Sequence, residues 1–483
     1  MEMLPDARLY IDGEMRDASG GKTFDNINPW TGEVVGKAAD ASAADVDAAI
    51  AAARRAFDET DWSLKHDYRF ELMKKFRDLL YANRDKLVKI SMLECGAAPG
   101  AAFRAQIDGA LSGADGLLEC FPHVKWDEDR GIRNEYGFDT KRIVAHEAMG
   151  VVGAITPWNY PVMSAVWKIA PALLAGNSVV LKPSPYTPLS SIFMAELLEE
   201  VLPAGVLHVV AGGDALGAAL AHHPRVRKVS FTGSTAAGKK VYAAGADDMR
   251  RLTLELGGND AAIVLDDVDP DAIVEKLFRG AFENSGQVCV AIKRLYVHER
   301  VADKLTRALA ERIAAAKVGA AMEEGVELGP INNAKQFERV TELVEDARAR
   351  GGKIETGGAR IGEQGYFFAP TLVSGLADDA RLVREEQFGP ALPILTFSDE
   401  ADAFARANAT DFGLAGSIWS GDPARAADLA GALECGTVWI NQHLTIMPIA
   451  PICGWKNSGL GVENGELGLL SFTQLQTVEV ALG

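Results

Sequence analysis

The cysteines of this chain form neither a disulfide framework nor a metal-binding pattern. They are odd in number and widely spaced, and none belongs to a Cys-x-x-Cys motif. Such a distribution is typical of a protein from a reducing compartment and argues against a zinc knuckle. We therefore expect no metal site. The five cysteines are Cys95, Cys120, Cys289, Cys435 and Cys453.

The chain also lacks any run of basic residues. It has 49 Lys and Arg residues against 67 Asp and Glu residues, which gives a formal net charge of −18. A field of that sign repels polyanions. The composition therefore argues against nucleic acid as a partner.

No segment has the pattern of a signal peptide or a membrane span. The first residues, MEMLPDARLYIDGEM, include acidic side chains and lack an apolar core. The long uncharged stretch 148–167 contains two glycines and two prolines, which is typical of a buried strand and turn. We expect a cytoplasmic protein that makes no membrane contact.

The segments that are present alternate between helix-like and strand-like patterns. Helical spacing of apolar residues marks 41–57, where Ser42 is an N-cap candidate, and 68–90. From Gly150 onward, short β-branched stretches such as GVVGAITP, GNSVVLKP and RKVSFTG alternate with helix-like ones. This order predicts βαβ units and a parallel sheet, with ligands at the carboxyl ends of its strands.

The second half repeats this α/β texture, so the 483 residues indicate two or three domains. The boundary is placed near residue 256, at the sequence ELGG. The charged stretch 130–147 and the alternating segment 472–480 suit neither core. They predict a protruding ribbon that pairs with another subunit or, equally, an ordinary surface hairpin.

The stretch FTGSTAAGKK, at 231–240, comes within one residue of a phosphate-binding P-loop. Glycines followed by a helix start suit a phosphate group. However, Lys240 stands where a P-loop has the Ser or Thr that holds magnesium. Asp266, after an apolar strand, could be the acidic residue that a triphosphatase needs in addition to its P-loop. A nucleotide triphosphatase, another phosphate site and a plain strand-to-helix turn all remain open on this stretch alone.

A series of motifs in a fixed order resolves this ambiguity. Together they closely resemble the NAD(P)-dependent aldehyde dehydrogenase superfamily, and the resemblance runs nearly end to end. The motifs are TPWNYP (156–161), LKPSP (181–185), FTGST (231–235), LELGG (254–258), GQVC (286–289), EEQFGP (385–390) and SGLG (458–461).

The resemblance implies an α/β fold of the aldehyde dehydrogenase type. Its expected parts are a Rossmann-type dinucleotide-binding domain, an α/β catalytic domain and a small β oligomerisation ribbon. On this chain they fall at 1–125 with 149–257, at 258–457, and at 126–148 with 470–483.

The resemblance also implies the oxidation of an aldehyde to a carboxylic acid. Cys289 matches the family's nucleophile, whose thiolate forms a tetrahedral adduct that loses hydride and leaves a thioester. Glu255 matches the base that activates water for hydrolysis. Asn159, with the backbone N–H of Cys289, matches the donors to the oxyanion. Glu463 aligns with a carboxylate sometimes assigned to a proton relay.

A dinucleotide cofactor follows from the same resemblance. Lys182 matches a ligand of the adenosine ribose, Gly233 and Ser234 match ligands of the pyrophosphate, and Glu386 and Phe388 match ligands of the nicotinamide end. The expected cofactor-binding residues are Thr156, Trp158, Lys182, Ser184, Thr232, Gly233, Ser234, Gly238, Leu256, Glu386 and Phe388.

Several positions depart from the family pattern. Pro185 stands where NAD-preferring relatives often carry Glu, so we expect NAD without excluding NADP. Ile452 and Cys453 replace the Phe-Gly of the family and reshape the substrate entrance, and Val462 replaces an Arg, which weakens inference about subunit contacts. The expected wall of the substrate tunnel is mainly apolar and comprises Ser164, Trp167, Val288, Val290, Ile446 and Ile452.

The expected partners are a small-molecule aldehyde and further copies of the chain, in a homodimer or homotetramer. Transfer of the acyl group to coenzyme A is an alternative, which the intact Glu255 disfavours. A catalytically inactive binding protein is a third reading. It is disfavoured because a nucleophile, a base and an oxyanion donor are all present.

Overall fold

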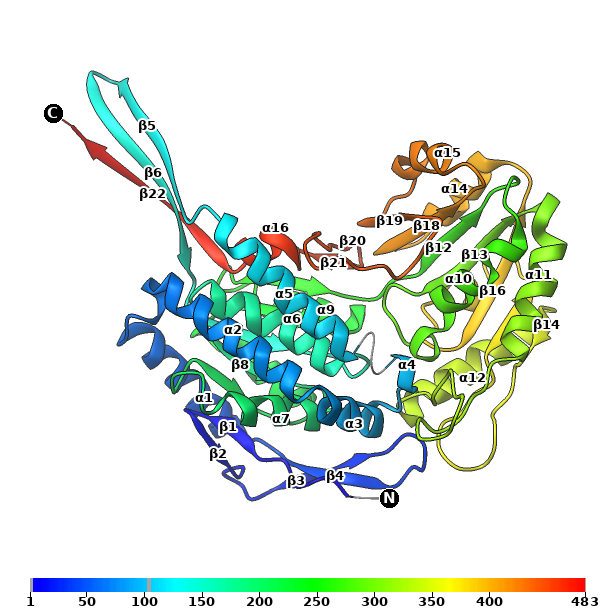
Figure 1. Cartoon of the computed structure of the whole chain (residues 1–483), viewed down its shortest axis with the longest axis horizontal. Coiled ribbons are helices and arrows are strands. Elements are labelled where there is room, and N and C mark those ends of the chain that lie inside the picture. Colours follow the sequence, from blue (N-terminus) through cyan, green and yellow to red (C-terminus); the bar gives the residue numbers. More distant parts are fainter. Residues whose placement is uncertain (1–2, 102–105, 483) are drawn as a thin grey trace.

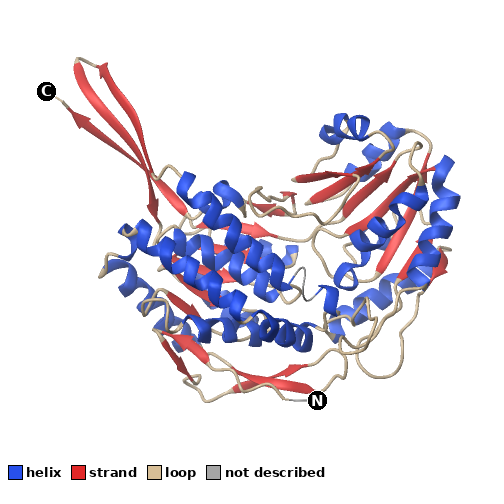
Figure 2. Ribbon diagram, in the orientation of Figure 1, coloured by secondary structure: helices blue, strands red, loops and turns tan. Residues whose placement is uncertain are grey.

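The computed structural model describes residues 3–101 and 106–482. Two sheets, each packed with helices, make up the body of the molecule, and a narrow ribbon extends from it (Figures 1 and 2). Within the described ranges, no helix is long and apolar enough to cross a membrane.

An eight-stranded sheet dominates the first half, with the order β2-β1-β9-β8-β7-β10-β11-β21. The strands from β9 to β11 in this order run parallel, whereas β1, β2 and β21 pair antiparallel. Its strands are β1 (Leu9–Ile11), β2 (Glu14–Arg16), β7 (Val151–Ile155), β8 (Ser178–Lys182), β9 (Leu207–Val209), β10 (Val226–Thr232), β11 (Arg251–Glu255) and β21 (Gly459–Leu460).

The strand order of this sheet contains a switch point between β7 and β10. From β7 the chain proceeds through β8 to β9 on one side, and β10 and β11 lie on the other. The loops that follow β7 and β10 therefore diverge, and this leaves a crevice at the carboxyl ends of the strands. The parallel sheet agrees with the sequence prediction.

Helices cover both faces of this sheet, and β7 and β8 are therefore buried along their whole length. Helices α1, α8 and α9 form one group, whereas α6 and α7 form another that is backed by α2, α3 and α5. The bounds are α1 (Ala43–Asp58), α2 (His66–Ala82), α3 (Arg84–Cys95), α4 (Pro99–Ala101), α5 (Gly109–Cys120), α6 (Pro161–Leu174), α7 (Leu189–Leu198), α8 (Asp214–His222) and α9 (Thr235–Ala244).

The first helices show where local sequence signals succeed and where they fall short. Ser42 caps α1 in a reciprocal capping box with Asp45, as its position before the apolar pattern indicates. The helical pattern over 68–90, in contrast, is divided at Asn83 into α2 and α3. The apolar spacing continues through this break, so the spacing alone does not show it.

A seven-stranded sheet forms the second half, with the order β14-β15-β16-β13-β12-β18-β19, and only β14 is antiparallel to its neighbour. Its strands are β12 (Asp260–Val264), β13 (Ile292–His298), β14 (Lys353–Thr356), β15 (Thr371–Ser374), β16 (Ala391–Phe397), β18 (Ala415–Trp419) and β19 (Thr437–Ile440). The helices of this half are α10 (Pro270–Phe282), α11 (Glu299–Ala314), α12 (Ala334–Ala349), α13 (Arg381–Arg384), α14 (Glu400–Asn408), α15 (Pro423–Asp428) and α16 (Gly465–Leu470), the last of which packs on α5 and α6 of the first half.

Three antiparallel strands form the ribbon, in which β22 pairs with β6 and β6 with β5. The ribbon projects from the body, at the upper left of Figure 1, and exposes apolar side chains. Its strands are β5 (Asp127–Glu135), β6 (Phe138–Ala148) and β22 (Thr473–Ala481). The protrusion agrees with the sequence prediction, and pairing with another subunit stays a prediction.

The remaining elements are short. Two further antiparallel pairs are β3 (Thr23–Ile27) with β4 (Val34–Ala39) and β17 (Phe412–Gly413) with β20 (Trp455–Lys456). The 3-10 helices are η1 (Trp62–Leu64), η3 (Phe121–His123), η4 (Glu283–Gly286) and η5 (Ala430–Ala432).

Candidate active site

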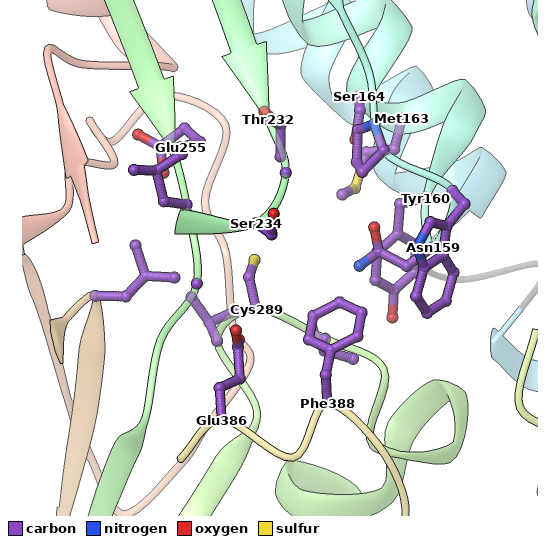
Figure 3. A pocket seen from close by; sticks show the side chains of 18 of the residues that line it. Asn159, Tyr160, Met163, Ser164, Thr232, Ser234, Glu255, Cys289, Glu386 and Phe388 are labelled. Carbon is purple, nitrogen blue, oxygen red and sulfur yellow. The ribbon is translucent and has the colours of Figure 1, made fainter. Parts of the chain in front are cut away.

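A cleft of about 1590 Å³ is lined by residues from both halves of the molecule. It brings together the four residues that the sequence predicted to be catalytic, Cys289, Glu255, Asn159 and Glu463. Figure 3 shows the Cys289 sulfur directed into the space that lies between Glu255 on β11 and Asn159 on the far side.

Cys289 lies in the loop between η4 and β13, directly after a stretch of unusual backbone. Three successive residues of η4, Asn284, Ser285 and Gly286, have positive φ angles of 50°, 56° and 72°. A Cβ atom at Gly286 would collide with the carbonyl of Gly389. Glycine is therefore required here on steric grounds, and the close approach fixes the loop against the neighbouring segment.

Hydrogen bonds to distant segments hold this loop in place. The Ser285 hydroxyl donates to the Gly329 carbonyl at 2.7 Å, and the Gln287 side chain accepts from the Asn332 N–H at 2.8 Å. The Asn284 amide donates to the Asn159 carbonyl at 3.2 Å. The position of Cys289 thus depends on contacts far apart in the sequence.

The Cys289 thiol is half-buried, and this burial raises its pKa to about 12. Lys293 opposes the increase, whereas the carboxyl groups of Glu255, Asp260 and Glu386 add to it. The thiol is therefore protonated at neutral pH, and a base must take its proton before it can attack a carbonyl carbon.

Glu255 is the last residue of β11 and is only 8% exposed. Burial and the nearby Glu463 raise the pKa of Glu255 well above its ordinary value, although Lys168 opposes this. Its Oε1 atom has no hydrogen-bond partner among the described residues. A carboxyl group in this state can accept a proton from a thiol or from water near neutral pH.

Glu463 is held by a buried ion pair behind Glu255. The Lys168 ammonium donates to Glu463 Oε1, and the Ser230 hydroxyl donates to the same oxygen at 3.2 Å. Lys168 is fully buried. These contacts place a second carboxylate within the electrostatic reach of Glu255.

Asn159 follows β7, one residue before the buried Tyr160. Its Nδ2 donates to the Gln287 carbonyl at 2.9 Å, and its own carbonyl accepts from the Gln106 side chain. The amide is thus held beside the cysteine loop. A fixed N–H donor at this position is what a developing oxyanion requires.

The ends of β8 and β10 supply the predicted ligands of the cofactor. Lys182 ends β8, and burial lowers its pKa to about 8. Ser234 is the N-cap of α9 and accepts from the Ala237 N–H, while the Gly233 N–H donates to the Glu255 carbonyl at 3.0 Å. The predicted ligands that line the cleft are Thr156, Trp158, Lys182, Ser184, Thr232, Gly233, Ser234, Leu256, Glu386 and Phe388.

Gly238 is different, because it does not line the cleft. It lies inside α9, where a Cβ atom would overlap the side chain of Leu256. A glycine at this position allows the helix to pack closely on the residue that follows Glu255. The structure therefore explains Gly238 by packing rather than by contact with a ligand.

The residues that made 231–240 look like a P-loop have ordinary surroundings. Lys239 and Lys240 are exposed residues of α9, as expected. Asp266 forms ion pairs with Arg300 and Arg425 on the surface of the second sheet. These positions do not support a triphosphatase.

Glu386 and Phe388 come from the other side of the cleft. Glu386 Oε1 accepts from the Gly258 N–H at 3.1 Å, and a Cβ atom at Gly257 would overlap the Glu386 carboxylate. Phe388 has a positive φ of 47° and packs edge-to-face on Trp158, with ring centroids 5.3 Å apart. Both side chains face the cleft beside Cys289 (Figure 3).

The predicted substrate wall also lies in this cleft. Ser164, Trp167, Val288, Val290, Ile446 and Ile452 all line it, and apolar Met163 and Leu444 join them. His443 lines the cleft as well, but burial lowers its pKa to about 3 and both ring nitrogens are hydrogen-bonded, to Ser417 and to Val290. These predicted wall residues are uncharged and mostly apolar, but charged side chains also line the cleft, namely Asp108, Glu275, Lys276, Arg279 and Glu283.

Two buried charged residues near Cys289 were missed by the sequence analysis, Lys293 on β13 and Asp260 on β12. The signal that could have found them is a charged residue inside a short apolar strand, as in AIKRLYVH and NDAAIVL. Such a charge requires a partner when it is buried.

Comparisons with known proteins match the whole chain to one group. The model of the "Aldehyde dehydrogenase family" matches residues 15–478. Human retinaldehyde dehydrogenase 3 is 37% identical over 99% of this chain and 93% of its own length. Two solved structures are also similar: a Mycobacterium tuberculosis aldehyde dehydrogenase complexed with NAD+ (36% identity, TM-score 0.96, 100% of this chain and 99% of that chain) and a Bacillus cereus aldehyde dehydrogenase in complex with NAD+ (35%, 0.95, 99% and 97%).

Proposed function

Since the chain belongs to the aldehyde dehydrogenase family and oxidises aldehydes with NAD, we propose that Cys289 is the nucleophile of this reaction, Glu255 its base and Asn159 an oxyanion donor. The observation that carries this assignment is the convergence of a thiol, a raised-pKa carboxyl group and a fixed amide on one cleft.

The residues of the cleft fit a dinucleotide. A Cβ atom at Gly233 would lie 2.6 Å from the Phe231 ring, so glycine is required at this turn on steric grounds. The first residues of α9 that follow it line the cleft, and a helix N-terminus suits a phosphate. The Thr156 hydroxyl is buried without a hydrogen-bond partner among the described residues. Lys182 and Ser234 would hold the adenosine ribose and the pyrophosphate, and Glu386 the nicotinamide ribose. NAD, when bound, supplies the acceptor for the hydride.

The protein's own residues account for the remaining chemistry. Glu255 takes the proton of the Cys289 thiol, and the thiolate attacks the carbonyl carbon of the aldehyde. The Asn159 amide and the Cys289 N–H stabilise the oxyanion. After oxidation the acyl group remains on Cys289 as a thioester. Glu255 then removes a proton from water, which attacks the thioester and releases the carboxylic acid and the thiol.

Glu255 can pass the proton that it takes up to the neighbouring carboxylate of Glu463. The buried ion pair with Lys168 holds that carboxylate in place. This assignment of Glu463 rests on its electrostatic contact with Glu255. The mostly apolar set of Trp167, Val288, Val290, Ile446 and Ile452 favours an aldehyde with an apolar body.

Three broader assignments complete the proposal. The eight-stranded sheet carries the dinucleotide site and the seven-stranded sheet the nucleophile. The ribbon joins copies of the chain into a dimer or tetramer, since it exposes Ile132, Phe138, Leu475, Val478 and Val480. The enzyme works in the cytoplasm, and its five free cysteines support this.

A panel of aldehydes tests the function directly. The enzyme is assayed with NAD and with NADP, each with and without coenzyme A, and the product is identified as acid or thioester. We expect a carboxylic acid, faster turnover with NAD, and no requirement for coenzyme A. Because Pro185 neither binds a 2′-hydroxyl nor repels a 2′-phosphate, we expect the preference for NAD to be moderate. Absence of turnover across the panel would contradict the proposal.

A further inference from the structure

Lys293 lies directly behind the cysteine loop. Its side chain is 1% exposed, and its ammonium group donates to two successive carbonyls, those of Val288 at 2.9 Å and Cys289. These carbonyls belong to the proposed nucleophile and its neighbour. Lys293 therefore fixes the backbone from which the Cys289 thiol and N–H project.

The ammonium group is surrounded by buried carboxyl groups. Glu386 Oε1 lies 3.7 Å from Lys293 Nζ. Asp260 is buried, and its Oδ2 has no hydrogen-bond partner among the described residues. Burial raises the pKa of Asp260 to about 7 and also raises the pKa of Glu386, and in both cases Lys293 is the main opposing influence.

More carboxyl groups than cationic groups therefore act on the Cys289 thiol. Three carboxyl groups face it, Glu255 from β11, Asp260 from β12 and Glu386 from the loop after α13. The opposing positive charge comes from Lys293. A thiolate formed among these carboxyl groups requires a nearby cation, because like charges disfavour its formation.

A purely structural role would not require an ammonium group at this position. A neutral N–H donor can satisfy a carbonyl, whereas a buried charge is destabilising unless it is paired. Lys228 offers a comparison: it is also buried, but its ammonium donates to the Thr253 hydroxyl and lies over the Phe472 ring. Of these two buried lysines, Lys293 is the one that contacts the cysteine loop.

We propose that Lys293 is a positioning residue that holds the Cys289 loop and supplies the positive charge that favours the thiolate. This rests on the proposed role of Cys289. Lys293 acts through the loop and through its field. It forms no bond to the substrate.

The test is the pH dependence of Cys289 alkylation by iodoacetamide in the absence of aldehyde, followed by mass spectrometry of the Cys289 peptide. In Lys293→Met the midpoint should move to higher pH by about one unit or more, the size expected for loss of a close opposite charge. Lys293→Arg should restore most of the midpoint. Lys228→Met is the matched control and should leave the midpoint unchanged.

Lys293→Gln keeps a donor without the charge and should behave like Lys293→Met. If Lys293→Met does not fold, the alkylation midpoints of Lys293→Gln and Lys293→Arg can be compared instead, because they differ in charge. An unshifted midpoint in Met and Gln would overturn the proposal. Equal shifts in Gln and Arg would also overturn it, because they would indicate packing rather than charge.

The result is distinguishable from failure of the proposed function. Alkylation measures the thiol without turnover, so a shift in Lys293→Gln relative to Lys293→Arg stands whatever reaction the cleft performs. Loss of aldehyde oxidation in Cys289→Ala tests the nucleophile separately. If Cys289→Ala remained fully active, the proposed function would fail while the alkylation shift could still be observed.

Discussion

The two walls of the cleft are built differently. On the regular wall, formed by the eight-stranded sheet, Lys182 and Glu255 are the last residues of parallel strands. On the opposite, irregular wall, Cys289 and Glu386 lie in loops. Hydrogen bonds between neighbouring strands position the first pair. The second pair is positioned by contacts with distant segments, such as the bond from Ser285 to Gly329.

This difference indicates a division of labour between the two walls. The regular wall presents the proposed base and the cation expected to bind the cofactor, on the parallel strands of a doubly wound sheet. The irregular wall presents the proposed nucleophile just after a backbone stretch with positive φ angles, where each side chain needs its own support. Substitutions on the irregular wall should therefore affect chemistry, and substitutions at the cofactor end of the regular wall should affect binding.

The largest effect is expected at the thiol itself. Cys289→Ala removes the group that forms the covalent adduct, so kcat should fall by more than about 10⁴-fold. NAD binding, followed by fluorescence titration, should be retained because the ligands of the cofactor are intact. Cys435→Ala changes a buried cysteine that is not among the residues lining the cleft, so it is the control and should keep most of the activity. Comparable loss in both variants would contradict the assignment.

Asn159 connects the two walls, because it follows a strand of the regular wall and its amide donates to the Gln287 carbonyl of the irregular wall. A substitution at Asn159 therefore tests this contact. Asn159→Ala should lower kcat by roughly 10²- to 10³-fold, with a much smaller change in KM for the aldehyde. Steady-state kinetics separate the two parameters. A rise in KM alone would indicate that Asn159 binds substrate without stabilising the oxyanion.

Lys182 tests the binding side of the comparison. Lys182→Met removes a buried ammonium group at the end of β8 and should raise KM for NAD by about 10- to 100-fold, the usual cost of a lost charged hydrogen bond. The exposed Lys239 on α9 gives a matched control, since Lys239→Met should leave KM for NAD unchanged. An equal effect at Lys239 would revive a P-loop-like role for 231–240.

The pH dependence requires no substitution and concerns both walls. Burial raises the pKa values of both Cys289 and Glu255, and both groups must lose a proton before they react. Activity should therefore increase with pH and fall by at most about tenfold per unit for each group on acidification. The measurement is kcat/KM for the aldehyde from mildly acidic to alkaline pH. A maximum at acidic pH would show that neither raised pKa controls the reaction.

The regular wall could be predicted closely from the sequence. Apolar strands that end in Lys182 or lead into Gly233 place those residues at one sheet edge, because parallel strands share the direction of their carboxyl ends. The family motifs added the identities of the site residues. Trp167 and Ile446, which the sequence placed on the wall of the substrate tunnel, line the cleft, and their contact with a substrate stays a prediction.

The irregular wall could be predicted only in part. The motif GQVC pointed to Cys289, but several contacts that hold its loop join segments 40 or more residues apart, such as Ser285 with Gly329. Local patterns carry no record of such contacts. Asp260 was missed for this reason, since its carboxylate accepts from the Ala415 N–H, 155 residues away. Lys293 bonds to carbonyls only four and five residues away, but the apolar strand pattern does not show that the cysteine loop folds back onto its side chain. The packing role of Gly238 likewise depends on the position of Leu256 in space.

The most direct test removes the proposed base, Glu255, and follows the acyl group on Cys289. Without the base, the thioester on Cys289 should not be hydrolysed. Glu255→Gln, mixed with NAD and an aldehyde, should give a burst of roughly one NADH per active site or less and then stall. Mass spectrometry of the stalled enzyme should show the acyl group on the Cys289 peptide. Full steady-state turnover by Glu255→Gln, with no acyl group on Cys289, would contradict the account.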